Sequence, residues 1–403
     1  MNRQAIVAFL FSLLLVAPQL RAGEVARWNR LATDAAAAEQ TDPLNESRVF
    51  AIVHAAMHDA LNAIERRYEP YREGVASAPG ALPEAAVAAA AHAALIELMP
   101  ARKADFDMQF AETLAQISDK RAAAAGMRVG RQAAARLLAL RRDDGASRPV
   151  AHPAGTKSGE YRPTPPDFTP ALFAQWGRVQ PFVLTSSSQF RPTAPLAPTS
   201  ARARAEIDEV RAIGGKTSAL RSAEQSEISR YWYESSPQGW NRIAREVDAA
   251  RGLDEWQSAR LFALVNLAMA DGFIGGFEAK YHFNYWRPAT AIRESGNSSW
   301  LSDLDTPPVP DYPSTHTVLG AAAAAVLARF FDTDMVSFSM TSGAPYAGIT
   351  RRFWSFSEAA QENGASRILA GIHFQTAVRA GYVQGDLIGG WTYDRALRPV
   401  RVD

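Results

Sequence analysis

Apolar residues return every three to four positions along most of this chain, and this spacing limits the fold more than any other feature. Residues 47–67 show it clearly, because apolar side chains occupy positions 49, 52, 53, 56, 57, 60, 61 and 64. That pattern is the stripe of a helix that buries one face. Alternation of apolar and polar residues, which is typical of half-buried strands, is scarce. We therefore predict an all-α fold, a helical bundle, with further helices at 83–99, 105–142, 202–213, 222–233, 255–281, 313–331 and 357–388.

Two segments interrupt this series of helices. Residues 143–199 are rich in proline, glycine and serine, and their many aromatic side chains predict that the segment packs on the protein surface. Residues 301–312 form a shorter proline-rich loop. We expect a helical region at 23–250 and a C-terminal helical core at 251–403, packed together as one compact unit.

The N-terminus indicates export. Residues 1–22 combine Arg3 with an apolar stretch at 5–16 and a plausible cleavage site before Gly23, as in a signal peptide. We expect a periplasmic or secreted protein. No second apolar run looks long enough to span a bilayer, so we expect no transmembrane helix in the mature chain.

Composition excludes several kinds of chemistry. The chain has no cysteine, so thiol nucleophiles, thiolate zinc sites, iron–sulfur clusters and disulfides are ruled out. The formal net charge of +1 gives none of the basic excess that nucleic-acid binding needs. Any anion must therefore be bound by charges that are placed locally.

Three motifs in the C-terminal half could place such charges around one phosphate-shaped oxyanion. Lys280 and Arg287 are seven residues apart, two helical turns, so both can point from one helix face. Ser314 follows Pro313 at a predicted helix start, where unpaired N–H groups attract anions. His316 lies in that first turn, where it can act as an acid or base. The third motif begins with Ser366 and Arg367 and ends at His373; Ser366 and His373 are again spaced for one helix face.

Together and in this order, the motifs resemble the superfamily of vanadium-dependent haloperoxidases and type 2 phosphatidic acid phosphatases. Its signature is Lys-x6-Arg-Pro, then Pro-Ser-Gly-His, then Ser-Arg-x5-His-x3-Asp. The strings at 283–288 and 306–314 look more like soluble haloperoxidases than membrane phosphatases. The core of the resemblance covers residues 259–388, and residues 50–62 also look like bacterial relatives.

The resemblance implies a role for each residue of the motifs. His373 would bond vanadium, and His316 would be the acid or base. The oxygens of vanadate would be held by the remaining motif residues, Lys280, Arg287, Ser314, Thr315 and Arg367. A haloperoxidase would use vanadate to activate hydrogen peroxide toward halide. The alternative is an exported acid phosphatase that needs no cofactor, in which His373 attacks a phosphoester to form a phosphohistidine. A non-enzymatic oxyanion-binding relative is a third reading; the oligomeric state is not indicated.

This chain departs from the family pattern at four positions. Thr315 replaces the usual glycine, and its side chain could crowd the anion. Ala377 replaces the aspartate that would orient His373, so another acceptor is needed. Val309 and Phe277 stand where haloperoxidases often carry a halide-side histidine or aromatic residue and a tryptophan. The halide side is therefore less supported than the oxyanion side.

One other histidine pair has the spacing of metal ligands. His54 and His58 are four residues apart and share a face of the predicted helix. No third ligand is evident in the sequence. We therefore interpret the two as packed or hydrogen-bonded inside the helix.

Overall fold

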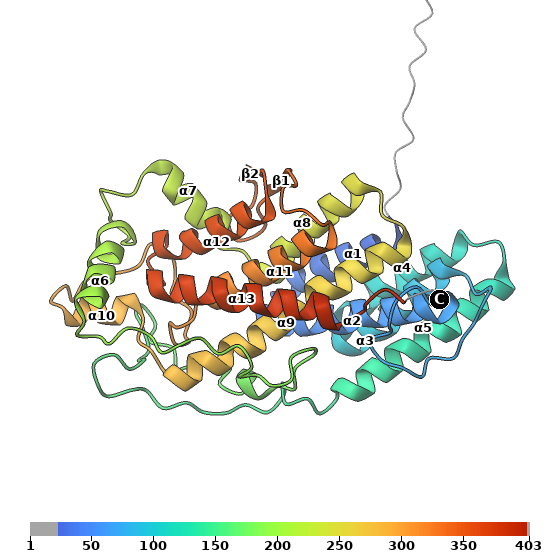
Figure 1. The fold of residues 1–403 in the computed structure, drawn as a ribbon, viewed down its shortest axis with the longest axis horizontal. Helices are drawn as coiled ribbons and strands as arrows, with labels where there is room; N and C mark the ends of the chain where they lie inside the picture. The colour runs from blue at the N-terminus through green and yellow to red at the C-terminus, as the bar shows by residue number, and fades with distance from the viewer. Residues whose placement is uncertain (1–22, 401–403) are drawn as a thin grey trace, which may run out of the picture.

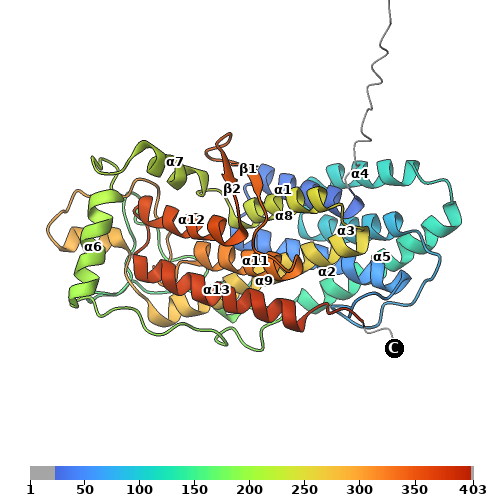
Figure 2. The same cartoon turned by 45° about the horizontal axis from the view of Figure 1, so that its top comes forward.

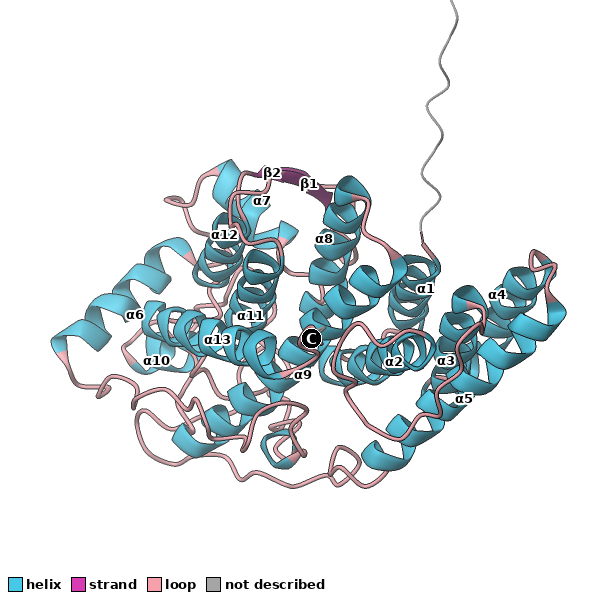
Figure 3. Cartoon of the chain, turned by 45° about the vertical axis from the view of Figure 1, so that its right-hand side comes forward, coloured by secondary structure: helices cyan, strands magenta, loops and turns pink. Residues whose placement is uncertain are grey.

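The computed structural model describes residues 23–400, whose regular secondary structure is almost entirely helical (Figure 1 and Figure 3). The predicted signal sequence at residues 1–22 lies outside the described residues. The α-helices are α1 (Glu24–Glu39), α2 (Pro43–Ile64), α3 (Pro83–Leu98), α4 (Lys103–Ala115), α5 (Lys120–Arg141), α6 (Ala201–Ile213), α7 (Ala223–Tyr231), α8 (Ser236–Arg251), α9 (Glu255–Phe283), α10 (Pro288–Glu294), α11 (Thr315–Phe330), α12 (Phe356–Leu369) and α13 (Gln375–Arg395). Short 3-10 turns lie at Pro100–Arg102 and Trp176–Arg178. The predicted all-α class is confirmed.

The longest helix, α9, runs through the middle of the molecule. It starts at Asp254, whose side chain accepts the N–H of Gln257 in a capping box. It packs against α2 of the N-terminal helical region and against α11 and α13 of the C-terminal region (Figure 2). Its apolar window is long enough to cross a membrane by composition, so the expectation of no second such run is wrong. That window is 94% buried inside the protein, as in a core helix.

Small residues let the helices on both sides of α9 approach closely, as the alanine-rich sequence predicts. A Cβ on Gly130 of α5 would lie 2.2 Å from the carbonyl oxygen of Ala86 in α3. A Cβ on Gly385 of α13 would lie 2.2 Å from the carbonyl oxygen of Val318 in α11. Both helix contacts therefore need glycine at these crossings.

The irregular segment 143–199 packs on the helices, as predicted. Asp271 of α9 is buried and accepts the backbone N–H groups of Phe182, Val183 and Leu184 at 2.7, 2.7 and 2.8 Å. These bonds satisfy a buried carboxylate and fix the segment along α9. Within the same segment, the side chain of Trp176 is buried.

The chain breaks in two places where one helical stretch was predicted. Residues 105–142 divide into α4 and α5, because the side chain of Asp119 caps the second helix at the N–H groups of Arg121 and Ala122. Residues 357–388 divide into α12 and α13. Gly371 lies between them with a φ of 79°, and a Cβ there would lie 2.1 Å from the carbonyl oxygen of Gly214. A continuous helix is impossible through this close approach.

Four elements have no counterpart in the sequence-based prediction. They are α1, α8, α10 and a small antiparallel hairpin of β1 (Phe338–Thr341) and β2 (Thr350–Phe353). The strands have four residues each, which is too short for an alternating pattern to stand out.

Candidate active site

The three motifs meet at one end of the C-terminal bundle, on the side where α6 and α10 lie in Figure 1. Lys280 lies in the last turn of α9, and Ser314 precedes the first turn of α11. Arg367 lies in the last turn of α12, and His373 lies in the turn between α12 and α13. Helix ends and loops, rather than helix faces, therefore build the candidate site.

The predicted arrangement of Lys280 and Arg287 on one helix face is wrong. Asn284 ends α9 with a left-handed φ of 48°. Arg287 follows in an extended conformation, with φ −87° and ψ 157°, because Pro288 disfavours helical geometry before it. The two cations still converge, since the chain turns back toward the end of α9.

Both cations are held by carbonyl groups of the proline-rich loop before α11. Lys280 Nζ donates to the carbonyls of Pro310 and Asp311 at 2.7 and 3.0 Å. Arg287 Nε donates to the carbonyl of Val309 at 2.8 Å. Burial lowers the pKa of Lys280 well below its usual value and also lowers that of Arg287; in both cases Asp311 opposes the shift. Two buried positive charges beside one carboxylate leave this end of the bundle suited to an anion.

His373 lies between a cation and a carboxylate. Arg287 Nη1 is 3.1 Å from Nε2 and 3.5 Å from Nδ1, and it also donates to the carbonyl of Ile372 at 2.7 Å. Nδ1 lies 2.9 Å from Asp311 Oδ1. Burial, followed by Arg287 and the other nearby cations, lowers the pKa of His373 well below its usual value. The imidazole is therefore neutral, as a metal-ligating or nucleophilic histidine must be.

Asp311 is the residue that the sequence analysis missed. It is completely buried, and neither carboxylate oxygen has a well-aligned hydrogen bond among the described residues. Burial raises the pKa of Asp311 to about 7, although Arg287 and Lys280 oppose this rise. The available signal was an acid at the end of the proline-rich loop, three residues before Ser314 of the second motif.

The start of α11 leaves its first N–H groups free of a side-chain cap. Ser314 is the N-cap residue, but its hydroxyl accepts a bond from Thr317 Oγ1 at 2.9 Å and makes no capping bond. An uncapped start of a 16-residue helix favours a bound anion. The backbone N–H of Ser314 donates to the carbonyl of Ala377 at 3.0 Å, which ties this start to α13.

Thr315 does not have to crowd the anion. A Cβ on Gly276 of α9 would lie 2.5 Å from the Thr315 Cγ2 methyl group, so this methyl group packs on the bare backbone of α9. Gly276 therefore accommodates the threonine that replaces the usual glycine. The sequence analysis did not select Gly276, because only the crossing of α9 and α11 brings the two residues together.

His316 lies beside the start of α8. Its Nδ1 is 2.9 Å from the hydroxyl of Ser236, a contact that sequence reasoning also missed. Burial, followed by the charge of Arg367, lowers the pKa of His316 well below its usual value. His316 is the most exposed of the predicted site residues, because the others are buried and it is only partly so. It can therefore exchange protons with solvent from the edge of the site.

The Arg367 side chain has an N–H donor without an acceptor in the described part of the chain, which shows whether an oxyanion fits the candidate site. Its Nη1 donates to the carbonyl of Trp232 at 3.2 Å. Its Nε is buried and has no hydrogen-bond partner among the residues that the structure describes. Burial lowers the pKa of Arg367 to about 10, so the side chain remains a cation at neutral pH. An oxyanion bound here would supply the missing acceptor, so the donor set fits vanadate or phosphate.

Ser366 and the two halide-side positions have structural contacts instead. Ser366 Oγ donates to the carbonyl of Asn363 at 2.6 Å, so its predicted alignment with His373 on one helix face is wrong. Phe277 packs edge-on against Phe173 and Phe273. Val309 is a buried member of the main hydrophobic core.

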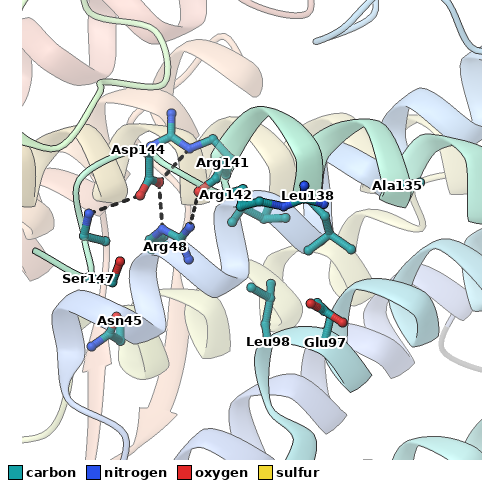
Figure 4. A pocket seen from close by; sticks show the side chains of 12 residues that line it. Asn45, Arg48, Glu97, Leu98, Ala135, Leu138, Arg141, Arg142, Asp144 and Ser147 are labelled. Carbon is teal, nitrogen blue, oxygen red and sulfur yellow. Dashed lines mark hydrogen bonds and ion pairs between the residues drawn. The ribbon is translucent and has the colours of Figure 1, made fainter.

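A separate cavity lies away from the motifs and carries a different set of side chains (Figure 4). It encloses about 670 Å³ beside α2, α3 and α5. Arg48 Nε and Arg141 Nε both donate to Asp144 Oδ2, at 2.7 and 3.0 Å, as the dashed lines show. Both of these guanidinium groups are engaged by the Asp144 carboxylate, whereas Arg367 Nε of the motif cluster has no partner among the described residues.

His54 and His58 are buried and hydrogen-bonded, as interpreted from the sequence. His54 Nδ1 donates to the carbonyl of Phe50 at 2.7 Å, and its Nε2 accepts from Asn29. His58 contacts Asp59 and Asn62. Within residues 23–400, no group of three or more histidine, aspartate or glutamate side chains has the arrangement of a metal site.

The packing of Thr315 on Gly276 predicts a defined pair of variants. We expect Gly276→Ala to weaken vanadate binding by about tenfold, because an overpacked contact costs about 1–3 kcal/mol and pushes Thr315 toward the anion. Adding Thr315→Ser removes the clashing methyl group and should restore binding. Equilibrium dialysis with orthovanadate measures both effects, and unchanged binding in Gly276→Ala would contradict this account of Thr315.

The chain is similar in sequence to known vanadium haloperoxidases. Residues 260–401 match the family model described as the VCPO second helical-bundle domain. The vanadium chloroperoxidase of Curvularia inaequalis is 28% identical, and the match covers 50% of this chain and 45% of that protein. This chain thus matches about half the length of that relative.

Solved structures extend the similarity to nearly the whole chain. A bacterial vanadium-dependent iodoperoxidase has a TM-score of 0.84 and 26% identity, covering 94% of this chain and 98% of its own. An apo-type bacterial vanadium-dependent chloroperoxidase has a TM-score of 0.73 at 17% identity, covering 88% and 94%, and shares the fold. The chain is therefore similar to vanadium haloperoxidases in sequence and in fold, as its motifs predicted.

Proposed function

We propose that this protein is a vanadium-dependent haloperoxidase that oxidises halide with hydrogen peroxide. The observation that carries the proposal is the convergence of a neutral His373 with Lys280, Arg287 and Arg367 at one buried end of the bundle. The similarity to a bacterial iodoperoxidase over almost the full chain supports it.

Vanadate would be held by the buried cations and by the start of α11. Lys280, Arg287 and Arg367 would face its oxygens with Ser314 and the N–H of Thr315, and the Nε2 lone pair of His373 would bond the vanadium. When bound, vanadate supplies a Lewis acid that activates hydrogen peroxide toward attack by halide.

The protein's own side chains orient the anion and move protons. The three cations neutralise the charge of the oxyanion, and the buried setting excludes bulk water. His316, neutral and at the exposed edge, would accept a proton from incoming peroxide and return one to the departing oxygen. The hydroxyl of Ser236 fixes the His316 ring by its contact with Nδ1.

Paired assays on one metal-stripped preparation test the proposal. One assay adds orthovanadate, hydrogen peroxide and bromide or iodide with a halogen-trapping dye. The other adds a chromogenic phosphate monoester without vanadate. We expect vanadate-dependent halogenation of the dye and no phosphate release. Phosphate release that vanadate inhibits would instead establish the phosphohistidine reaction, and vanadate binding without either turnover would indicate a non-enzymatic relative.

The contact between Ser236 and His316 predicts a change in turnover without a change in anion binding. We expect Ser236→Ala to lower the turnover number about fivefold, since a lost hydrogen bond of about 1 kcal/mol leaves the ring free to rotate. Vanadate affinity should stay within twofold. The neighbouring Ser235 bonds to Glu46 instead, so Ser235→Ala is a matched control that should keep turnover. Equal turnover in both variants would remove the positioning role of Ser236.

A further inference from the structure

We infer that Asp311 orients His373 in this chain and fixes which ring nitrogen carries the proton. The inference rests on the proposed function, because it names the residue that prepares His373 to bond the oxyanion's central atom. It also identifies the acceptor that Ala377 cannot provide. Asp311 is a positioning residue, since it acts through His373 and does not contact the anion itself.

The loop that carries Asp311 is fixed at several points. The carbonyl groups of residues 309, 310 and 311 accept hydrogen bonds from Lys280 or Arg287, as described above. The backbone N–H of Asp311 donates to the carbonyl of Tyr285 at 2.9 Å. The cations that face the anion site therefore also clamp the backbone of Asp311. Its carboxylate has little freedom to turn away from His373.

The contact between Asp311 and His373 selects one tautomer. An ionised carboxylate oxygen 2.9 Å from Nδ1 favours a proton on that nitrogen, because two lone pairs at this distance repel. An ionised carboxylate can only accept, so Nδ1 carries the hydrogen. Nε2 then keeps its lone pair, and Arg287 Nη1 lies 3.1 Å from this nitrogen. This is the tautomer that a histidine needs to bond a metal centre through Nε2.

Arg287, whose Nη1 lies 3.9 Å from Asp311 Oδ1, and Lys280 favour the ionised carboxylate, whereas Glu206 disfavours it. Of the acids that the structure describes, Asp311 alone makes an ion pair with His373. No other carboxylate in residues 23–400 can therefore take over its role.

At the position where the family usually carries this aspartate, the present chain has Ala377. Ala377 is buried and packs in the cluster with Tyr285 and Phe374. Its side chain has no acceptor, and its carbonyl already accepts from Ser314 at 3.0 Å. The carboxylate beside His373 therefore comes from the loop before α11 and not from the first turn of α13. Ala377 is four residues after His373, so an aspartate introduced there tests whether the role of Asp311 can be restored from the family's usual position.

The test compares Asp311→Ala, Ala377→Asp and the double variant Asp311→Ala/Ala377→Asp with the wild-type protein. Two quantities are measured at pH 8 without peroxide or halide. The first is the tautomer of His373, from ¹⁵N shifts of histidine-labelled protein, with signals assigned by their loss in His373→Ala. The second is the affinity for orthovanadate, from equilibrium dialysis.

We expect wild-type His373 to be protonated at Nδ1. Asp311→Ala should lose this preference and bind vanadate about 10–100-fold more weakly, the usual effect of removing an outer-shell partner. The double variant should again be protonated at Nδ1 of His373 and should bind vanadate within about tenfold of wild type, because the acid is restored at the usual position. A wild-type tautomer protonated at Nε2, or an Asp311→Ala variant with unchanged tautomer and affinity, would overturn the inference.

A matched control separates positioning from general packing. Asp271 is equally buried on α9 but caps backbone N–H groups of the irregular segment, nine residues before Lys280. Asp271→Asn should lower thermal stability while leaving the His373 tautomer unchanged. The tautomer is also read without vanadate, so it decides the role of Asp311 even if the protein proves to have no haloperoxidase activity.

Discussion

His373→Ala is expected to abolish vanadate-dependent halide oxidation while leaving the helical fold intact. His373 is the only predicted residue that can form a bond to the central atom, and its loss leaves just hydrogen bonds and charge to hold the anion. We expect vanadate affinity to fall by more than the roughly 100-fold that marks the loss of an outer-shell partner. Halogenation of the trapping dye and equilibrium dialysis give the two measurements.

His92, a histidine outside the three motifs, provides the control for this variant. His92 of α3 pairs with Asp107 of α4 at 2.8 Å, so His92→Ala removes an imidazole without touching the candidate site. It should keep full turnover. Circular dichroism of both variants checks that the helices persist. A folded His373→Ala protein with wild-type turnover would refute the assignment of this end of the bundle as the active site.

Arg287→Met is expected to lose both anion affinity and stability. The guanidinium donates to the carbonyls of Val309 and Ile372, and its Nη1 lies 3.9 Å from Asp311 Oδ1. Removing one member of a buried ion pair typically costs about 3–5 kcal/mol, because the remaining charge is buried without compensation. Losing a charge-assisted donor to the oxyanion should also weaken vanadate binding by about 100-fold.

A second substitution separates these two effects. In Arg287→Met/Asp311→Asn the uncompensated carboxylate is gone, so the free energy of unfolding should recover most of its loss. Vanadate affinity should remain low, because the guanidinium is still absent and the Asp311 carboxylate no longer positions His373. Arg293 of α10, which donates to the carbonyl of Trp300, provides the arginine control. If the double variant regained vanadate affinity, Arg287 would have a structural role alone.

Much of the fold follows from the sequence because helical periodicity is local. The stripe at residues 47–67 predicted α2, and the alanine-rich stretches predicted close helix contacts, such as the crossing at Gly130. Helix breaks were harder to predict. Gly371 and Asn284 end or interrupt helices through left-handed backbone geometry, and whether a residue adopts it depends on neighbours such as Gly214.

The identity of the site residues also came from the sequence, but their arrangement did not. Spacing suggested that Lys280 and Arg287 share one helix face, and that Ser366 and His373 share another. In the structure each pair is divided by a helix end. The set was selected because the order of the motifs is characteristic of a family, whereas the inferred geometry assumed uninterrupted helices.

The sequence by itself determined the helical class, the family and the cations, histidines and serine of the candidate oxyanion site, since these are properties of residue type and order. Only the tertiary structure decided how the departures from the family pattern are compensated. Gly276 makes room for Thr315 across two crossing helices, and Asp311 reaches His373 from a separate loop. Both contacts join residues that are distant in the chain. A local sequence pattern does not predict such a contact, because the packing of the helices brings the two residues together.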